Sequence, residues 1–364
     1  MAQTALTLTY DSILTTTLFN VRGILYDQIF LSNVYFNWLH QKGRKRSVNG
    51  GERIQIGLQT GTNSTVKSYS GYELLDTTPQ DNLNSAFYTW KQVAGSVAIN
   101  RLEERQNSGE AQIMGLLQQK VNELQLSMAD EVSRQVIAGA LEGTAGTADG
   151  PFIAGNSSKD LLPLPAIIAA DPTTGTDATL GSIDGSTETY WRNQAAESTA
   201  TTTKAYKDEL RNMYNDCSKG PGGGPDMVLM SQTAFEHYES ALDDHSRHTN
   251  TAMADLGFDN VRLKGATVVW DERVVDAAQG NLSAADGGTI DTTDGNTAYF
   301  INSNFMELIV DSQTDFISTP FVRPENQDAK VAQVLFYGEH TCNNRRKLGV
   351  LKGIVNAALT ASTG

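Results

Sequence analysis

"SAFYTWKQVAGSVAI" (residues 85–99) is followed closely by "NSGEAQIMGLLQQKVNELQLSMADEVSRQVIAGAL" (residues 107–141), and this pair decides the fold. The first stretch alternates apolar and polar residues, which predicts a long strand over 86–100 with one face toward water. The second stretch predicts an amphipathic helix over 109–142, because its apolar residues recur every three or four positions. These residues are Ile113, Leu117, Val121, Leu124, Met128, Val132 and Val136.

Both ends of this predicted helix carry end signals. Asn107, with Glu110 three residues later, resembles a capping box, and Gly143 can terminate the helix. Such a helix is about 50 Å long at 1.5 Å per residue, whereas typical globular helices have about 11–12 residues. A long strand beside a long helix predicts an elongated body. The alternative is an ordinary core helix that is broken once or twice.

A polar ribbon precedes the strand, from Gly50 to Leu75. Ile54, Ile56 and Leu58 alternate with polar residues, and the sequence Gly-Thr-Asn-Ser at 61–64 is typical of a turn. We expect Val66 to Leu75 to return as a second strand. An isolated hairpin is only marginally stable in water, so this ribbon needs a partner surface.

The densest basic run of the chain lies just before the ribbon. It consists of Lys42, Arg44, Lys45, Arg46 and, a little later, Arg53. One interpretation is contact with the acidic surface of a neighbouring copy, and the other is a solvated turn. Nucleic-acid binding is less consistent with the run, which lacks interleaved aromatic residues. Residues 12–40, rich in apolar and aromatic side chains, suggest an arm that packs on something else.

The second half of the chain mixes helices and strands. Residues 144–203 are rich in Gly, Thr, Ser and Ala and predict loops, with Trp191 and Arg192 anchoring a strand or turn. A helix at 205–217 precedes the breaker GPGGGP. A buried strand, DMVLMS, then leads into a helix capped by Ser231. Further strands are expected within 261–274, 297–311 and 329–355, so the fold class is α+β.

Composition limits the possible functions. The 364 residues suggest about two domains, and the net charge of −14 disfavours binding of polyanions over the whole surface. No signal peptide and no apolar run long enough for a membrane span is recognisable. Cys217 and Cys342 fit inert thiols in a reducing compartment. These features predict a protein of the cytoplasm.

Signatures of catalysis are missing from the sequence. GPGGGP is not a phosphate loop, because its prolines lack amide donors and no Lys-Ser/Thr pair follows. There is no GxSxG and no HExxH motif. His245 and His248, with Asp243 and Asp244, could ligate a metal, although a solvated loop is the simpler interpretation. We therefore expect no enzyme activity, catalytic residue, cofactor or metal.

The order of these elements resembles the major capsid protein of tailed bacteriophages, whose fold was first seen in phage Hong Kong 97. The resemblance covers roughly residues 15–355 and is weakest over 143–190. Beyond the two opening stretches, it rests on YWRNQ (190–194), PDMVLMSQTAFEHYESAL (225–242), LKGATVVWDERV (263–274) and QVLFYGEHTCNNRRKLGVLKGI (333–354).

The resemblance implies a Hong Kong 97-type capsid fold with five regions. They are an N-terminal arm (1–48), an extended β-hairpin loop (49–80), a peripheral domain (81–160) with its spine helix (109–142), an axial domain (161–300), and return strands shared by both domains (301–364). The extended loop would lie across a neighbouring subunit, and the arm would reach over another neighbour.

The resemblance also implies a function and partners. Hexamers and pentamers of the chain would close into an icosahedral head around packaged double-stranded DNA, contacted non-specifically. Expected helpers are a separate scaffolding protein and a portal, with a decoration protein as an optional further partner and no membrane partner. The chain would be located in the virion, after assembly in the bacterial host cytoplasm. The candidate contact residues between subunits are Arg44, Lys45, Arg46, Arg53, Lys67, Tyr69, Tyr72 and Trp38.

Two other functions are open at this point. An encapsulin-like nanocompartment would share the fold but enclose a cargo enzyme. A soluble metal-dependent hydrolase or binding protein would use the region around His245 and His248. Some capsid proteins of this kind carry Lys–Asn crosslinks, and Lys67 lies in the ribbon, but we predict no crosslink for it.

Overall fold

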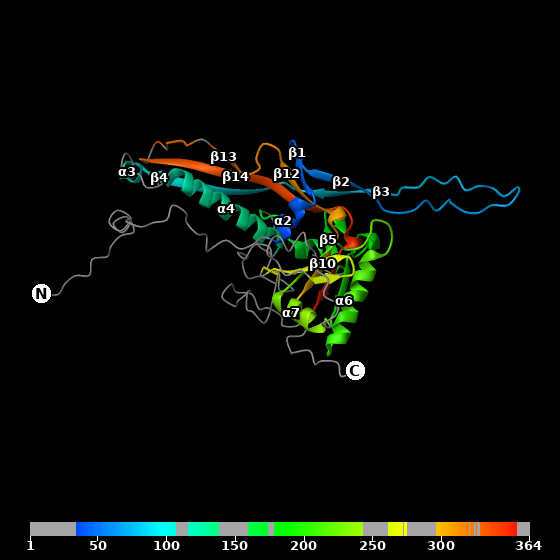
Figure 1. Ribbon diagram of the computed structural model, residues 1–364. Coiled ribbons are helices and arrows are strands. Elements are labelled where there is room, and N and C mark those ends of the chain that lie inside the picture. Colours follow the sequence, from blue (N-terminus) through cyan, green and yellow to red (C-terminus); the bar gives the residue numbers. More distant parts are fainter. Residues whose placement is uncertain are drawn as a thin grey trace.

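The computed structural model describes residues 34–106, 116–137, 159–173, 178–242, 261–271, 273–274, 296–319, 321–323, 325 and 328–354. Figure 1 shows an elongated upper layer of long strands with helix α4 beneath it. A second sheet lies below, next to α6 and α7, and a long loop projects from the upper layer between β2 and β3.

The upper layer is built on one long pair of strands. β4 (Lys91–Asn100) pairs antiparallel with β14 (Ala329–Cys342), from Lys91↔Gly338 to Asn100↔Ala329. β12 (Met306–Asp311) and β13 (Ile317–Ser318) also pair with β14, and β1 (Lys45–Val48) adds parallel to β12. Residues far apart in the chain therefore share one sheet.

Helix α4 (Leu116–Ile137) packs under β4, as the sequence predicted. β4 turns alternate residues inward, including the buried Val97 and Ile99, and leaves the others exposed. Gly95 allows the close approach of α4, because a Cβ there would lie 2.5 Å from Leu124 Cδ1. A short helix not predicted from the sequence, α3 (Arg101–Gln106), follows β4. The proposed caps Asn107, Glu110 and Gly143 lie outside the described residues.

The single long strand predicted over 86–100 is wrong, because it is two strands with different partners. β3 (Leu83–Tyr88) ends before Thr89, and β4 begins at Lys91. β3 pairs with β2 (Ile54–Gln59), from Ile54↔Tyr88 to Gln59↔Leu83. The predicted return strand at 66–75 is therefore also wrong. Two segments, 66–75 and 83–88, were possible partners for β2. Ala86 and Tyr88 of the second segment bury their side chains in the core, whereas residues 66–75 are not buried.

The described part of the predicted N-terminal arm belongs to the body of the subunit. Helix α2 (Val34–Gln41) buries Val34, Tyr35, Trp38 and Leu39 in the main core, and β1 then joins the first sheet. The expectation that residues 34–48 extend over a neighbour is corrected by this packing. Residues 1–33 lie outside the described part of the chain.

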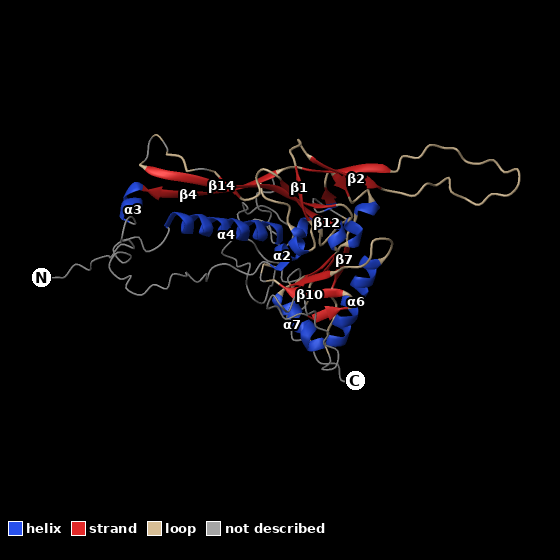
Figure 2. Ribbon diagram, turned by 45° about the horizontal axis from the view of Figure 1, so that its top comes forward, coloured by secondary structure: helices blue, strands red, loops and turns tan. Residues whose placement is uncertain are grey.

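The second sheet has the order β7-β15-β11-β8-β10-β9. Its strands are β7 (Gln194–Glu197), β15 (Gly349–Lys352), β11 (Ala298–Ile301), β8 (Met227–Met230), β10 (Ala266–Trp270) and β9 (Val261–Leu263). Helices α6 (Thr203–Ser218) and α7 (Gln232–Ala241) lie against this sheet (Figure 2) and share a second core with it. The Ser231 cap is confirmed, since its side chain accepts a hydrogen bond from Ala234 N.

A compact segment joins the two sheets. It contains α5 (Leu164–Ile167), β5 (Thr179–Leu180), β6 (Ile183–Asp184) and the 3-10 helix η4 (Thr189–Trp191). Trp191 is buried and donates to Leu180 O, and Arg192 donates to Gly185 O and Ser186 O. The predicted anchoring role of these two side chains in a turn is confirmed.

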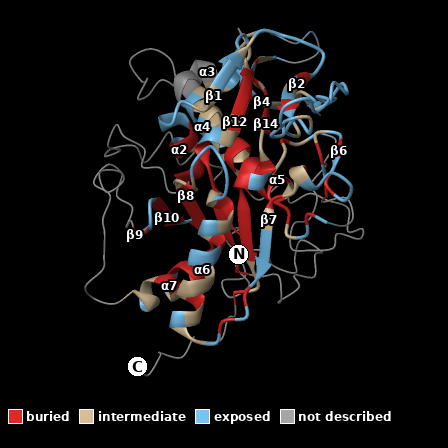
Figure 3. Cartoon of the chain, turned by 90° about the vertical axis from the view of Figure 1, so that its right-hand side faces the viewer, coloured by how far each residue is buried: buried red, intermediate tan, exposed pale blue. Residues whose placement is uncertain are grey.

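Two buried cations bind loop carbonyls near the C-terminal strands. The 3-10 helix η7 (Arg345–Lys347) directs the Arg345 guanidinium, 0% exposed, to Ile167 O at 2.8 Å and Ala178 O at 3.0 Å. Lys347 Nζ donates to Lys219 O at 2.8 Å and Gly220 O at 2.9 Å. Buried charge is tolerated only with such partners, so both side chains hold their loops in one place. Figure 3 shows the buried strands at the centre of the molecule.

We expect Gly95→Val to destabilise the unassembled subunit by about 1–3 kcal/mol, because the added methyl groups overpack the contact between β4 and α4. Urea unfolding followed by circular dichroism measures this. Gly57→Val in β2 is the matched control, since a Cβ at Gly57 meets nothing within 4 Å. Equal stability of the two variants would contradict close packing at Gly95.

Candidate functional site

The loop between β2 and β3, residues 60–82, is the most exposed feature of the fold. It extends away from the body (Figure 1), and its side chains form local hydrogen bonds. Asn63 Oδ1 accepts from Thr65, Asp76 Oδ1 accepts from Thr78, and Ser64 donates to Gln80. The exposed fractions of its large apolar residues are Val66 81%, Tyr69 64%, Tyr72 106%, Leu74 92% and Leu75 60%.

Clustered apolar exposure of this kind marks an interaction surface. Tyr69, Tyr72 and Lys67 are exposed, as contact residues must be. Leu74 and Leu75 were not among the contact residues predicted from the sequence, which assigned them to the expected return strand. The pairing of β2 with β3 is what leaves them in a loop.

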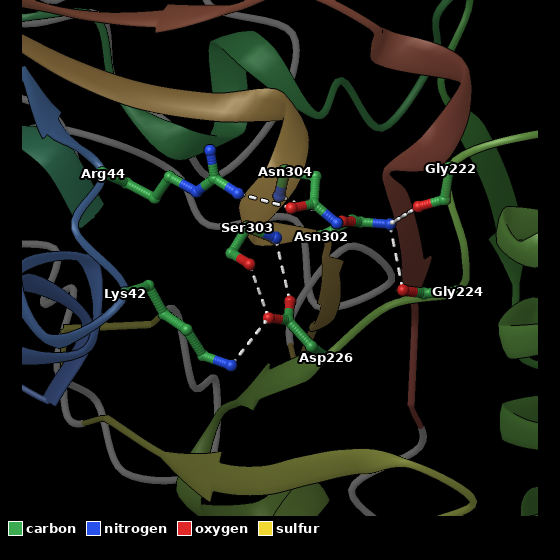
Figure 4. Close-up of polar contacts among 8 residues, drawn as sticks. All are labelled: Lys42, Arg44, Gly222, Gly224, Asp226, Asn302, Ser303 and Asn304. Atoms are coloured by element: carbon green, nitrogen blue, oxygen red, sulfur yellow. Dashed lines mark hydrogen bonds and ion pairs between the residues drawn. The ribbon is translucent and has the colours of Figure 1, made fainter.

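Three residues of the basic run are used within the subunit. Lys42 Nζ lies 3.2 Å from an Asp226 oxygen, and Arg44 donates to Asn304 Oδ1 (Figure 4). Lys45 Nζ lies 2.5 Å from Asp315 Oδ2. Arg44 and Lys45 are therefore less available to another copy than the sequence suggested.

Asp226 is the centre of a polar junction between the two sheets. It stands just before β8 and accepts hydrogen bonds from Ser303 N at 2.8 Å and Ser303 Oγ at 2.6 Å. Ser303 begins the 3-10 helix η6 (Ser303–Phe305), through which the chain passes from β11 to β12. Asn302 Nδ2 donates to Gly224 O at 2.9 Å (Figure 4). Lys42 adds the N-terminal segment to this junction.

Arg46 and Arg53 remain available. Both are exposed, and their guanidinium groups have no hydrogen bond or ion pair with the described residues. Both line an open groove of about 360 Å³ together with Trp90, Phe305 and residues of β1, β2 and β12. In the structure, Lys42, Arg44 and Lys45 of the basic run therefore have partners within the subunit, whereas Arg46 and Arg53 lie at the surface. The sequence alone does not distinguish these two groups.

Trp38 is corrected as a contact residue. Its side chain is 4% exposed in the single chain and stacks on Tyr35, with ring centroids 6.0 Å apart. Trp38 therefore belongs to the core. Helical spacing explains the error, because the aromatic face of a short helix looks the same whether its own chain or a neighbour covers it.

A buried polar cluster ties α2, β14 and the segment before α5 together. Tyr35 Oη lies 3.0 Å from His340 Nε2, and the other ring nitrogen, Nδ1, lies 3.2 Å from Leu162 O. Glu339 accepts from Leu162 N at 2.7 Å. Burial raises the pKa of Glu339 to about 7 and lowers the pKa of His340 to about 4. Sequence reasoning missed this cluster, although polar residues within the apolar strand run VLFYGEHTC were a usable signal.

The described residues offer no metal centre. They contain no group of three His, Cys, Asp or Glu side chains placed to hold an ion. His245 and His248, with Asp243 and Asp244, lie outside the described residues. Among the described helices, none combines the length and apolar character that a membrane crossing requires.

Comparison with known proteins rests on structure, because no family model and no curated protein matches the sequence. The capsid asymmetric unit of cyanophage A-1(L) aligns with a TM-score of 0.64 at 13% identity, over 92% of this chain and 96% of that one. The capsid of Myoviridae phage XM1 aligns with a TM-score of 0.54 at 13% identity, over 93% and 97%. The holo-SrpI encapsulin of Synechococcus elongatus PCC 7942 gives 0.53 at 10% identity, over 95% and 95%.

These likenesses define the class of fold. The chain has the Hong Kong 97-type capsid fold, of class α+β, as the sequence predicted. Apart from residues 34–48, which belong to the body rather than to an arm, the division into arm, extended loop, peripheral domain and axial domain stays a prediction. Its shared return strands have a counterpart in the topology, since β12 and β14 lie in the first sheet and β15 in the second.

We expect Glu339→Gln to stabilise the unassembled subunit by about 1–3 kcal/mol at pH 8. The folded pKa of Glu339, about 7, exceeds its ordinary value of 4.5. The folded state therefore holds the proton more tightly, and wild-type stability falls as pH rises from 4.5 through 7. The Gln variant has no carboxyl at this position, so its stability does not fall in this way as pH rises.

His340 works in the opposite direction, since its lowered pKa costs stability as pH falls from 6.5 through 4. Wild type and variant share that cost, so their difference isolates Glu339. Urea unfolding from pH 4.5 to 8 should show the difference growing with pH. Glu236→Gln, at an exposed site on α7, is the control. A pH-independent difference would refute the assignment.

Proposed function

We propose that this chain is the major capsid protein of a tailed phage. Copies of it assemble into hexamers and pentamers that close into an icosahedral shell around double-stranded DNA. The observation that carries this proposal is the projecting loop, whose large apolar side chains are all at least 60% exposed. On a capsid fold, a neighbouring copy is the natural cover for such a loop.

The geometry of the contact supports a ring-forming subunit. A loop on one side of the molecule that binds a different patch on the next copy makes a head-to-tail contact, and such contacts generate closed rings when the rotation closes. Several modest contacts per subunit then add up to a stable assembly through multivalency.

The charge of the chain fits a container for DNA. A net charge of −14 keeps a shell from adhering to the polyanion that it encloses, so contact with DNA is non-specific. Scaffolding protein, portal and decoration protein are the proposed helpers, and the virion is the proposed location, after assembly in the bacterial host cytoplasm. The role requires no catalysis and no cofactor.

An encapsulin-like compartment is the second candidate. The specific observation in its favour is that the encapsulin aligns with nearly the same TM-score, 0.53, as the phage XM1 capsid, 0.54. The similarity of fold does not distinguish a phage capsid from an encapsulin-like compartment, but the contents of native particles do. Double-stranded DNA in native particles supports the phage capsid, whereas a single cargo protein supports the compartment.

We expect the expressed full chain, alone or with its scaffolding protein, to form rings, tubes or closed shells. Negative-stain electron microscopy and sedimentation velocity measure this. A well-behaved monomer or dimer that a scaffolding protein leaves unchanged would sink the proposal.

We expect removal of the loop to block assembly while leaving the fold intact. Replacing residues 62–80 by Asn-Gly keeps β2 and β3 joined, because these strands pair outside the deleted segment. The variant should show wild-type circular dichroism and sediment as a monomer. Normal shells formed by this variant would show that the loop is dispensable.

A further inference from the structure

We propose that the groove beside β1 and β2 receives the middle of the projecting loop, Gly71–Asp76, from a second copy of this chain. This inference rests on the proposed function, since it names the receptor for the loop. It is argued from the shape and charge of the groove, the side chains of the loop, and the distance between them within one subunit.

The groove combines an apolar wall with a cationic rim. It lies where β1, β2 and β12 approach Trp90, and its volume is about 360 Å³. Arg46 and Arg53 supply two guanidinium groups, against the single carboxylate of Glu307 among its lining residues. The apolar lining comes from Val48, Ile54, Ile56, Trp90, Phe305 and Ile309.

The middle of the loop has the matching character. Its sequence, Gly-Tyr-Glu-Leu-Leu-Asp, places Tyr72, Leu74 and Leu75 among the carboxylates of Glu73 and Asp76. All three apolar side chains are more than half exposed. At roughly 25 cal/mol per Å² of apolar surface, covering such side chains is a strong driving force. The carboxylates can meet arginines, whose planar donors suit bidentate pairing.

A second groove of the subunit fits the loop less well. It has a volume of about 650 Å³ and runs beside β7. Apart from Tyr190 and Pro172, its apolar lining consists of alanines. Its Arg192 is already bonded to two carbonyls of its own chain, Gly185 O and Ser186 O, whereas Arg346 and Lys352 also line it. Both grooves therefore carry cations, but only the groove beside β1 and β2 combines them with large apolar side chains such as Trp90 and Phe305.

The loop of the same chain cannot fill this groove. The groove lies at the base of β2, and the loop leaves that base and extends away from the body, as both Figure 1 and Figure 2 show. Gly71–Asp76 is in the middle of the loop, so it lies far from its own groove. The occupant is therefore another copy, and the contact is head-to-tail.

Crosslinking tests the pairing directly. Tyr72→Cys in one chain and Gly57→Cys in another place one thiol on the loop and one on a groove position where a Cβ meets open space. The native Cys217 and Cys342 are buried. After co-assembly and mild oxidation with copper–phenanthroline and oxygen, we expect a disulfide-linked dimer on a non-reducing gel. Pairing Tyr72→Cys with Lys204→Cys, exposed on α6, should give at least tenfold less dimer.

Charge exchange tests the electrostatic part. Arg46→Glu with Arg53→Glu, or Glu73→Arg with Asp76→Arg, should each lower the yield of assembled particles at least tenfold at low salt, where charge contacts are strongest. Combining all four changes should restore most of that yield. Arg46→Lys with Arg53→Lys keeps the charge and should assemble. Circular dichroism confirms that each variant is folded.

The outcomes separate this inference from the proposed function. Wild-type shells without the specific crosslink, or with no rescue by the fourfold variant, would overturn the groove assignment and leave the capsid function standing. A wild-type chain that forms no ring, tube or shell would overturn both. A specific crosslink together with rescue would establish the groove as the receptor.

Discussion

The antiparallel pairing of β4 with β14 is the interaction on which the rest of the subunit depends. It joins residues 91–100 to residues 329–338 in continuous register, so segments far apart in the chain meet in one sheet. The inward face of β4 carries α4, and the opposite edge of β14 carries β12 and then β1. Because the ladder is long and narrow, the upper layer is elongated (Figure 1).

A small set of polar contacts links the second sheet to the first. Asp226 holds Ser303 at the passage from β11 to β12, and Lys42 brings in the N-terminal segment. Gly222 makes this approach possible, because its φ is 104° and a Cβ added there would lie 2.3 Å from Phe305 Cζ. Buried Arg345 and Lys347 bind the neighbouring loops through their carbonyl groups. These directional bonds act together with an apolar core that strands of both sheets share, including Leu229, Leu308 and Phe336.

The subunit leaves part of its apolar surface exposed. Ile54 and Leu58 at the base of the ribbon are buried in their own chain, whereas Tyr72 and Leu74 farther out are exposed. Along this one ribbon, the apolar residues at the base are therefore covered within the subunit, whereas those farther out are exposed. Free Arg46 and Arg53 near that base show the same division among charged residues.

Local periodicity by itself determined much of this protein. It predicted α4, α6, α7, the Ser231 cap and the class α+β, because side-chain spacing within one element reports which face is buried. Only the tertiary structure decided that β2 pairs with β3, that Trp38 faces its own core, and that Arg44 and Lys45 are used internally while Arg46 is not. The physical reason is that pairing partners and ion-pair partners are distant in sequence, so no local pattern distinguishes a residue covered by its own chain from one left for another copy.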